Sequence, residues 1–149
     1  MDNQAQALLT KYLQLLGRSA GKEMENIRAK MAWSLAQDLW EGLEKVPGTV
    51  EELISYLDRR LRVEFPFCEQ LGLQEVTPED IAVVIKGCAI KRANQDFMGN
   101  YQRSLCPVDP FLIFFLNRSY SQNVWLMENC PTGDGCVMKF SLSQSCALR

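Results

Sequence analysis

The sequence predicts an α+β fold in which N-terminal helices pack on a small antiparallel sheet that carries a further buried helix. Three observations predict it. Apolar residues recur at helical spacing through the first part of the chain, and after about Arg62 they form short runs separated by turn residues. The segment Phe111–Leu116 is apolar all round, which is typical of a helix buried on every side.

The first three helices are predicted from apolar spacing and capping residues. An amphipathic stripe from Leu8 to Leu16 stops at Gly17. The second helix runs from about Lys22 to Leu43. The third begins after Thr49, which forms a capping box with Glu52 because the spacing lets each side chain reach a free backbone N–H of the first turn.

The second helix is apolar on two sides, which bears on assembly. One stripe contains Met31 and Leu35, and a second, on nearly the opposite side, contains Trp33 and Trp40. A single domain covers one side readily, whereas a second exposed apolar side would be unusual for a monomer. The side with the two tryptophans is therefore expected to pack either on the first or third helix or on a second subunit.

The second half of the chain begins with two predicted strands, Gly72–Val76 and Ile81–Cys88, joined by a turn. The second of these is apolar on both faces, as expected of an interior strand. A short helix between Ala93 and Leu105 follows, interrupted by Gly99. Asp109-Pro110 then predicts a helix start, with the aspartate as cap and the proline in the first helical position.

The last two strands are predicted at Val124–Asn129 and Cys136–Leu142, joined by a five-residue turn at Pro131–Gly135. Side chains two apart in a strand share a face, so Glu128 and Cys130 point the same way. The turn is expected to bring Cys136 opposite Cys130.

Length, composition and charge limit the classes of function. The 149 residues fit one domain spanning 1–149, and the chain is 47% hydrophobic. The net charge of −2 and the scattered basic residues argue against nucleic acid as a partner. No basic and apolar leader is visible, and Phe111–Leu116, the longest apolar run, is far below the roughly 20 residues that span a bilayer. We therefore expect a cytoplasmic protein without a membrane span.

The chain has six cysteines and no histidine. Histidine-dependent catalytic triads and dyads are therefore excluded, and any metal ion must be held by sulfur and oxygen. Cys106 precedes the predicted buried helix, which would hold it against the sheet beside Glu128, Cys130 and Cys136. Two or three thiolates and one carboxylate suit a tetrahedral zinc ion. The alternative is that Cys130 and Cys136 are an unliganded reduced pair, and Cys68 and Cys146 are expected to be plain core residues.

The segment Cys106–Leu142 resembles the C-terminal half of the 4-vinyl reductase domain family. That family tends to show a cysteine opening a helix, an acidic residue near the end of the next strand, and a Cys…Gly-Asp…Cys hairpin. The matching positions are Cys106, Glu128, Cys130, Gly133-Asp134 and Cys136. Leu15–Gly21 also resembles the small-residue helix start of the family.

The resemblance implies the fold of ligand-binding domains in NO signalling and Golgi transport, which is also found in TRAPP vesicle-tethering subunits. It implies a zinc ion on the cysteine-and-carboxylate set, beside a buried apolar pocket of the kind that binds phenols and hydrocarbons. It also implies pairing of domains, which favours a homodimer through Trp33 and Trp40. Glu128 lies one residue closer to Cys130 than in the sensing members. This makes Cys88 an alternative fourth ligand, in an all-sulfur site for zinc or an iron-sulfur cluster.

A ligand pocket is expected between the Phe111–Leu116 helix and the strand that carries Trp125. Such pockets are mostly apolar with a few polar groups. The alternative is that the aromatic residues of this region are simply core. The candidate ligand-binding residues are Phe97, Tyr101, Phe111, Phe114, Phe115 and Trp125.

Three classes of function follow. The first is a module that binds a small apolar or aromatic molecule, as sensor or carrier, with a structural metal site rich in cysteine. The second is an accessory factor in tetrapyrrole or chlorophyll metabolism or in photosystem assembly. The third is a dimeric scaffold subunit without a ligand. No catalytic residue and no nucleotide-binding glycine motif is found, so an enzyme is not expected.

Overall fold

The computed structural model describes residues 3–101, 104–120 and 123–142, and the side chains of residues 100, 101 and 120 also lie outside the description. The predicted α+β class is confirmed. The elements, in chain order, are α1 (Asn3–Ala20), a 3-10 turn (Gly21–Glu23), α2 (Met24–Glu41), α3 (Val50–Glu64), β1 (Gln70–Val76), β2 (Asp80–Lys86), α4 (Lys91–Tyr101), α5 (Val108–Tyr120), β3 (Trp125–Thr132) and β4 (Gly135–Ser141).

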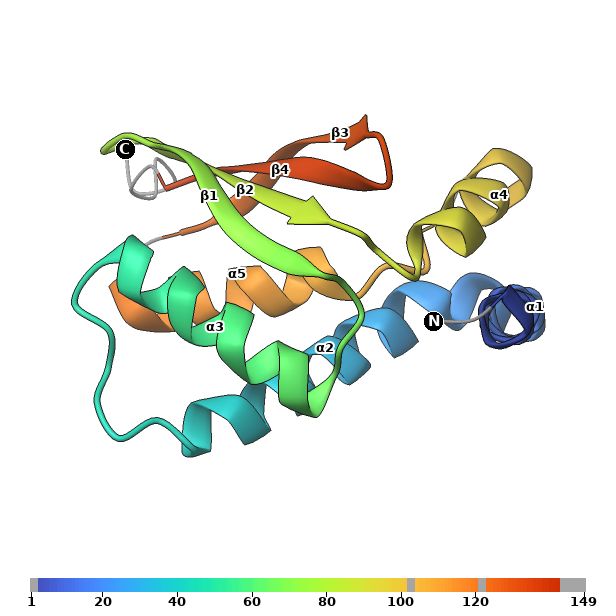
Figure 1. Ribbon diagram of the computed structural model, residues 1–149, viewed down its shortest axis with the longest axis horizontal. Coiled ribbons are helices and arrows are strands. Elements are labelled where there is room, and N and C mark those ends of the chain that lie inside the picture. Colours follow the sequence, from blue (N-terminus) through green and yellow to red (C-terminus); the bar gives the residue numbers. More distant parts are fainter. Residues whose placement is uncertain (1–2, 102–103, 121–122, 143–149) are drawn as a thin grey trace.

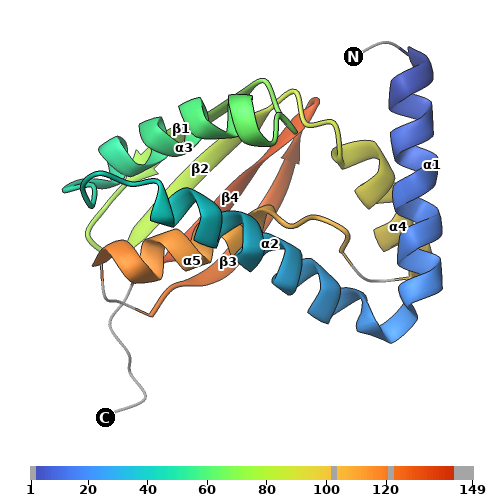
Figure 2. The ribbon, with the colours of Figure 1, turned by 90° about the horizontal axis from the view of Figure 1, so that it is seen from below.

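The four strands form one antiparallel sheet in the order β1-β2-β4-β3. β2 is an interior strand, as its apolar sequence predicted, and Ile81, Ala82, Val83 and Ile85 are all buried. Helices α2, α3 and α5 lie on one side of the sheet (Figures 1 and 2). The core is therefore a single layer of side chains between the sheet and these helices.

Helix α5 is the predicted buried helix. Phe111, Leu112, Phe115 and Leu116 are each 3% exposed or less. The helix begins at Val108, so Asp109 lies in its first turn rather than at its cap, and the predicted start was two residues late. The carboxylate of Asp109 accepts a hydrogen bond from Arg28 of α2, which ties the two helices together.

Helices α1 and α4 stand side by side at one end of the molecule, beyond the edge of the main core (Figures 1 and 2). The predicted stop at Gly17 is wrong, because α1 continues to Ala20. Gly17 instead permits close packing: a Cβ there would lie 2.5 Å from Cε2 of Phe97. Gly99 does not interrupt α4 either. The two helices share a small separate core of Met24, Ala93, Phe97 and Leu105.

Each of the two apolar sides predicted for α2 is covered only in part. Trp40 packs within the same chain, with its ring centroid 5.9 Å from that of Phe115. Trp33 is 53% exposed and Met31 is 47% exposed. The third helix, as predicted, starts with Thr49 accepting a hydrogen bond from the backbone N–H of Glu52.

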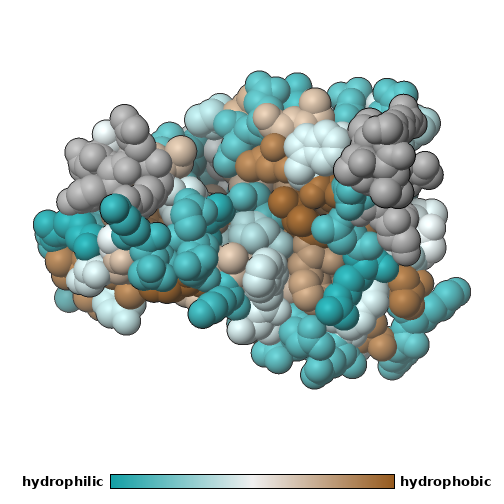
Figure 3. Space-filling model, turned by 180° about the vertical axis from the view of Figure 1, so that it is seen from behind, coloured by the Kyte–Doolittle hydropathy of each residue, from teal (hydrophilic) through white to brown (hydrophobic). Residues whose placement is uncertain are grey.

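The surface shows where apolar side chains remain outside the core. Figure 3, the side opposite to that of Figure 1, shows hydrophobic side chains gathered near the middle of the face with hydrophilic ones around them. Leu8 and Tyr12 of α1 are more than 60% exposed. Within the described parts of the chain, no helix combines the length and the apolar character needed to cross a membrane.

Candidate metal and ligand site

The β3–β4 hairpin is tighter than the sequence predicted. Both strands extend toward a two-residue turn, Gly133-Asp134, in place of the expected five-residue turn. Gly133 has a φ of 53°, which glycine adopts easily and which tight hairpin turns require. Cys130 consequently lies opposite Val137, and Cys136 lies opposite Pro131. The expectation that the two cysteines face each other is therefore wrong, since their side chains project from opposite faces of the sheet.

Glu128 and Cys130 share a face, as predicted, but that face points away from the helices. The Cys130 thiol donates a hydrogen bond to Oε1 of Glu128 at 2.9 Å, and Nζ of Lys139 lies 3.7 Å from Oε2. The thiol and the lysine lower the pKa of Glu128, and the carboxylate raises the pKa of Cys130. These two predicted ligands are thus separated from the others by the thickness of the sheet.

Cys88, Cys106 and Cys136 are brought together on the helix side. All three line one cleft of about 120 Å³ between α4 and the β3–β4 hairpin. Cys106 is buried, and the other two are partly exposed. The remaining lining side chains include Lys91, Asn94, Met98 and Asn129.

The hairpin turn positions Cys88. The backbone carbonyl of Asp134 accepts a hydrogen bond from the Cys88 N–H at 2.9 Å, and the Asp134 side chain accepts one from Gly87 at 3.1 Å. Gly135 passes so close to Ile85 that any Cβ at Gly135 would overlap the Ile85 carbonyl. The Gly-Asp-Gly sequence therefore holds the end of β2, and with it Cys88, against β4.

Two of the three thiols lie just before the N-terminus of a helix. The backbone N–H groups of Ile90 and Lys91, at the start of α4, act to lower the pKa of Cys88. The N–H group of Val108, at the start of α5, acts in the same direction on the pKa of Cys106. Free N–H groups and the helix dipole stabilise negative charge at such a position, which favours thiolate over thiol.

Burial opposes that charge. Desolvation raises the pKa of Cys106 to about 12 and that of Cys136 to about 11, and it also raises the pKa of Cys88. Cys88 and Cys136 each raise the pKa of Cys106 further, because the three sulfurs lie within electrostatic range of one another. Thiols of this kind are neutral at neutral pH unless a cation neutralises their charge.

The donor set suits a soft cation such as zinc, since sulfur is its preferred ligand alongside imidazole. Within the described residues, no three cysteine, aspartate or glutamate side chains lie close enough together to form a coordination shell as they stand. Cys88, Cys106 and Cys136 could do so only by turning their side chains into the cleft. Cys68 is partly buried at the edge of the main core, and Cys146 lies outside the described residues.

The backbone around Cys106 is held by side chains from two helices. Nη1 of Arg28 on α2 donates to the Cys106 carbonyl at 2.9 Å and to Oδ1 of Asp109 at 2.6 Å. Oδ1 of Asn94 on α4 accepts the N–H of Leu105 at 2.6 Å. Sequence reasoning missed Arg28 and Asn94, because polar residues within helices look like solvated surface until their partners, far along the chain, are known.

The candidate ligand-binding aromatics are dispersed. Phe115 is fully buried in the main core, and Phe114 packs edge-on to it beneath Arg118. Phe97 belongs to the small core between α1 and α4. Trp125 lies opposite Ser141, on the sheet face that points away from α5. The side chain of Tyr101 lies outside the described residues.

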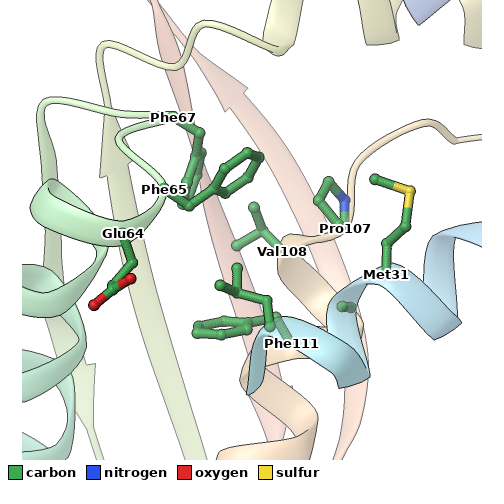
Figure 4. A pocket seen from close by; sticks show the side chains of 9 residues that line it. Met31, Glu64, Phe65, Phe67, Pro107, Val108 and Phe111 are labelled. Atoms are coloured by element: carbon green, nitrogen blue, oxygen red, sulfur yellow. The ribbon is translucent and has the colours of Figure 1, made fainter. Parts of the chain in front are cut away.

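Among the described side chains of this set, only Phe111 lines an apolar groove, which lies at the other end of α5 from the expected pocket. The groove measures about 150 Å³. Figure 4 shows Phe65 and Phe67, from the segment after α3, facing Pro107 and Met31 across it. Sequence reasoning missed this site, although Phe65-Pro66-Phe67 is an aromatic pair in a non-helical segment. The lining residues are Met31, Ala32, Leu35, Glu64, Phe65, Phe67, Pro107, Val108 and Phe111.

Consecutive residues of the chain line the apolar groove and the cleft formed by Cys88, Cys106 and Cys136, which we call the thiol cleft. Cys106 lines the cleft, and the next two residues, Pro107 and Val108, line the groove.

Comparison of the chain with protein-family models and with curated proteins gives no match.

Proposed function

We propose that this chain is a binding module for a small, uncharged apolar or aromatic molecule, acting as a sensor or carrier. The observation that carries the proposal is the groove beside Phe111, where Glu64 supplies the one polar side chain among the described residues of the lining. Apolar cavities of roughly 150 Å³ in other proteins accommodate a benzene-sized molecule. The resemblance to the 4-vinyl reductase domain family forms part of the same proposal, as does a cytoplasmic location, where thiols stay reduced.

The volume of the groove favours ligands with one or two rings. A tetrapyrrole macrocycle is several times larger than benzene and would need most of its surface covered for specific binding. The groove, at about 150 Å³, would cover only part of such a molecule. A simple aromatic compound is thus a better match than a chlorophyll precursor.

We propose further that Cys88, Cys106 and Cys136 hold a structural zinc ion or an iron-sulfur cluster. The support is their shared cleft and the position of Cys88 and Cys106 just before two helix starts, whose N–H groups act to lower the pKa of both thiols. These residues would supply three ligands of a tetrahedral site once their side chains turn into the cleft. A bound cation would supply the charge that stabilises three thiolates in a partly buried cleft, and would fasten α4, α5 and the hairpin to one another.

The ligand-binding proposal is tested by calorimetric titration of the reduced protein with 2-naphthol. Met31→Glu should weaken binding tenfold or more, because it places a carboxylate at a groove that already contains Glu64. Met127→Glu is the matched control, since Met127 is similarly exposed and lies on β3, away from the groove. No binding to the wild type, or equal weakening by both variants, would contradict the proposal.

A homodimer remains a second candidate, with or without a ligand. It is favoured by Trp33, a large aromatic side chain that is 53% exposed on α2. Trp40, the other predicted interface residue, already packs on Phe115 within its own chain. The proposed interface is therefore centred on Trp33, because a large exposed aromatic side chain is a typical interface anchor.

A further inference from the structure

Helix α1 leaves a row of apolar side chains on its outer side uncovered. Leu8 is 71% exposed, Tyr12 is 64% exposed and Leu15 is 44% exposed. Because residues three and four apart are neighbours on a helix surface, these side chains form one continuous row, which we call the α1 stripe. Among the described residues of α1, Gly17 alone is buried. The helix therefore gives only part of its apolar surface to the fold.

The place of α1 in the molecule keeps this stripe accessible. The helix lies at one end of the molecule, with α4 along one side of it (Figures 1 and 2). Its described contacts are with α4, α2 and the 3-10 turn, and not with the sheet. Single exposed apolar residues are normal on a protein surface, whereas three in one row are a feature of surfaces that bind a partner.

Basic side chains border the α1 stripe. Lys11 and Arg18 lie four and three residues from Leu15, so all three share one side of the helix, and both cations are exposed. Within the described parts of the chain, neither forms an ion pair with another side chain. Both line an open polar cleft of about 610 Å³ between α1 and α4. The acidic side chain of that cleft, Asp96, accepts a hydrogen bond from Gln14.

Charge is distributed unevenly over the molecule. Helix α1 contains no acidic residue. The end of the molecule formed by α1, the 3-10 turn and α4 has a net charge of +3, whereas the whole chain has −2, so the remainder has −5. An anionic surface would therefore attract this end and repel the rest. The charged residues of this end are Lys11, Arg18, Lys22, Lys91 and Arg92, against Glu23 and Asp96.

We infer that α1 binds the surface of an anionic membrane, lying flat with the α1 stripe among the upper parts of the acyl chains. An exposed apolar row bordered by lysine and arginine is typical of helices that lie in the membrane interface. Lys11 and Arg18 can reach the lipid phosphates while their methylene groups stay beside the apolar row. This inference is independent of the apolar groove beside Phe111, and so of the proposed ligand.

A second copy of the chain fits the α1 stripe less well. Pairing of two α1 helices through their stripes would bring Lys11 and Arg18 of one copy near the same residues of the other. Because α1 contains no acidic residue, nothing within the paired helices would neutralise these charges. An anionic lipid surface supplies the opposite charge and the apolar layer together.

The test measures co-sedimentation of the full chain with vesicles of phosphatidylcholine mixed with phosphatidylserine, and with vesicles of phosphatidylcholine alone. We expect at least about fivefold stronger binding to the mixed vesicles, and weaker binding to them as salt is added, because salt screens the attraction. Lys11→Gln should weaken that binding about fivefold. Arg59→Gln, which removes an exposed arginine from α3, should leave it unchanged.

A second pair of variants tests the apolar row. Leu8→Ser combined with Leu15→Ser should weaken binding about tenfold or more, because two side chains no longer enter the acyl layer. Val63→Ser is the matched control, since Val63 is 77% exposed on α3. Circular dichroism should show unchanged helix content in both variants. Lys11→Gln, which removes no leucine, gives an independent answer if the double variant loses helix.

Three results would overturn the inference: no binding to the mixed vesicles, equal binding to both kinds of vesicle, or equal weakening by Val63→Ser and by the leucine variant. Sedimentation velocity without lipid separates the membrane from a second copy. We expect the leucine variant to sediment as the wild type does. If it instead converts a wild-type dimer to a monomer, the α1 stripe is a subunit interface, and the inference is overturned.

Discussion

The side chains of Cys130 and Cys136 lie on opposite faces of the β3–β4 hairpin, although only five residues separate them in the chain. The cause is the two-residue turn, which places Cys130 opposite Val137. Cys136 therefore lies with Cys88 and Cys106 beside the helices, whereas Cys130 donates a hydrogen bond to Glu128 on the outer face. The two thiols are consequently expected to differ in every property that depends on a bound metal.

Cys136→Ser should lower zinc content well below one equivalent and lower the melting temperature of the zinc-loaded protein, because the energy of binding a structural metal is also folding energy. Cys130→Ser should leave both unchanged. Elemental analysis and thermal unfolding of the two variants check this prediction. Loss of zinc in Cys130→Ser with retention in Cys136→Ser would show that the metal lies on the other face.

Alkylation should test the burial of the Cys106 thiol in the metal-free protein. Burial raises the pKa of Cys106 to about 12, so at pH 8 roughly one molecule in ten thousand carries the reactive thiolate. Reaction with iodoacetamide should therefore be very slow at Cys106 and should accelerate as pH rises toward 12. Mass spectrometry of timed samples measures this rate. Rapid alkylation of Cys106 at pH 8 would show that this thiol is exposed to solvent, and would contradict its burial.

Gly17→Ala and Gly99→Ala form a matched pair in the two helices that share the small core. The new Cβ at position 17 would lie 2.5 Å from Phe97 and 2.7 Å from Leu105, so we expect destabilisation of about 1–3 kcal/mol. At position 99 nothing lies within 4 Å, and alanine should stabilise α4 by about 0.5–1 kcal/mol. Urea unfolding monitors both, and equal effects would contradict the packing described between α1 and α4.

Trp33 and Trp40 should respond differently to substitution. Trp33→Glu should give a folded protein that sediments as a monomer at concentrations where the wild type is a dimer. Trp40→Ala should instead lower stability by about 2–3 kcal/mol, because it removes the contact with Phe115 inside one chain. Sedimentation velocity and urea unfolding provide the two measurements. A monomeric wild type at high concentration would refute the dimer.

Much of the fold was predictable because the signals are local. Periodicity identified α2 and β2, and the Thr49 cap fixed the start of α3 to the residue. Gly17 and Gly99 led to wrong helix boundaries because glycine weakens a helix in isolation. In the folded chain, however, the absence of a Cβ at Gly17 lets Phe97 pack closely against α1. Local propensity contains no information about such tertiary contacts.

The site was predictable in its residue types but not in its geometry. The hairpin was recognised, yet its shorter turn shifts the pairing by one residue, so that Glu128 and Cys130 lie on the face opposite Cys136, since side-chain direction alternates with every residue. The groove depends on Phe65, Pro107 and Met31, which come from three distant segments. No spacing rule relates such positions, so only the folded chain reveals that they meet.

Ligand binding in the groove can be tested by a crystal structure of the protein soaked with 4-bromophenol, with data collected at the bromine absorption edge. The bromine marks the ligand position through its anomalous signal, independently of how the side chains are interpreted. We expect one strong anomalous peak in the groove between Met31, Phe65 and Phe111. A peak at another place, or a groove without a peak in crystals that bind 4-bromophenol elsewhere, would contradict the proposed binding function.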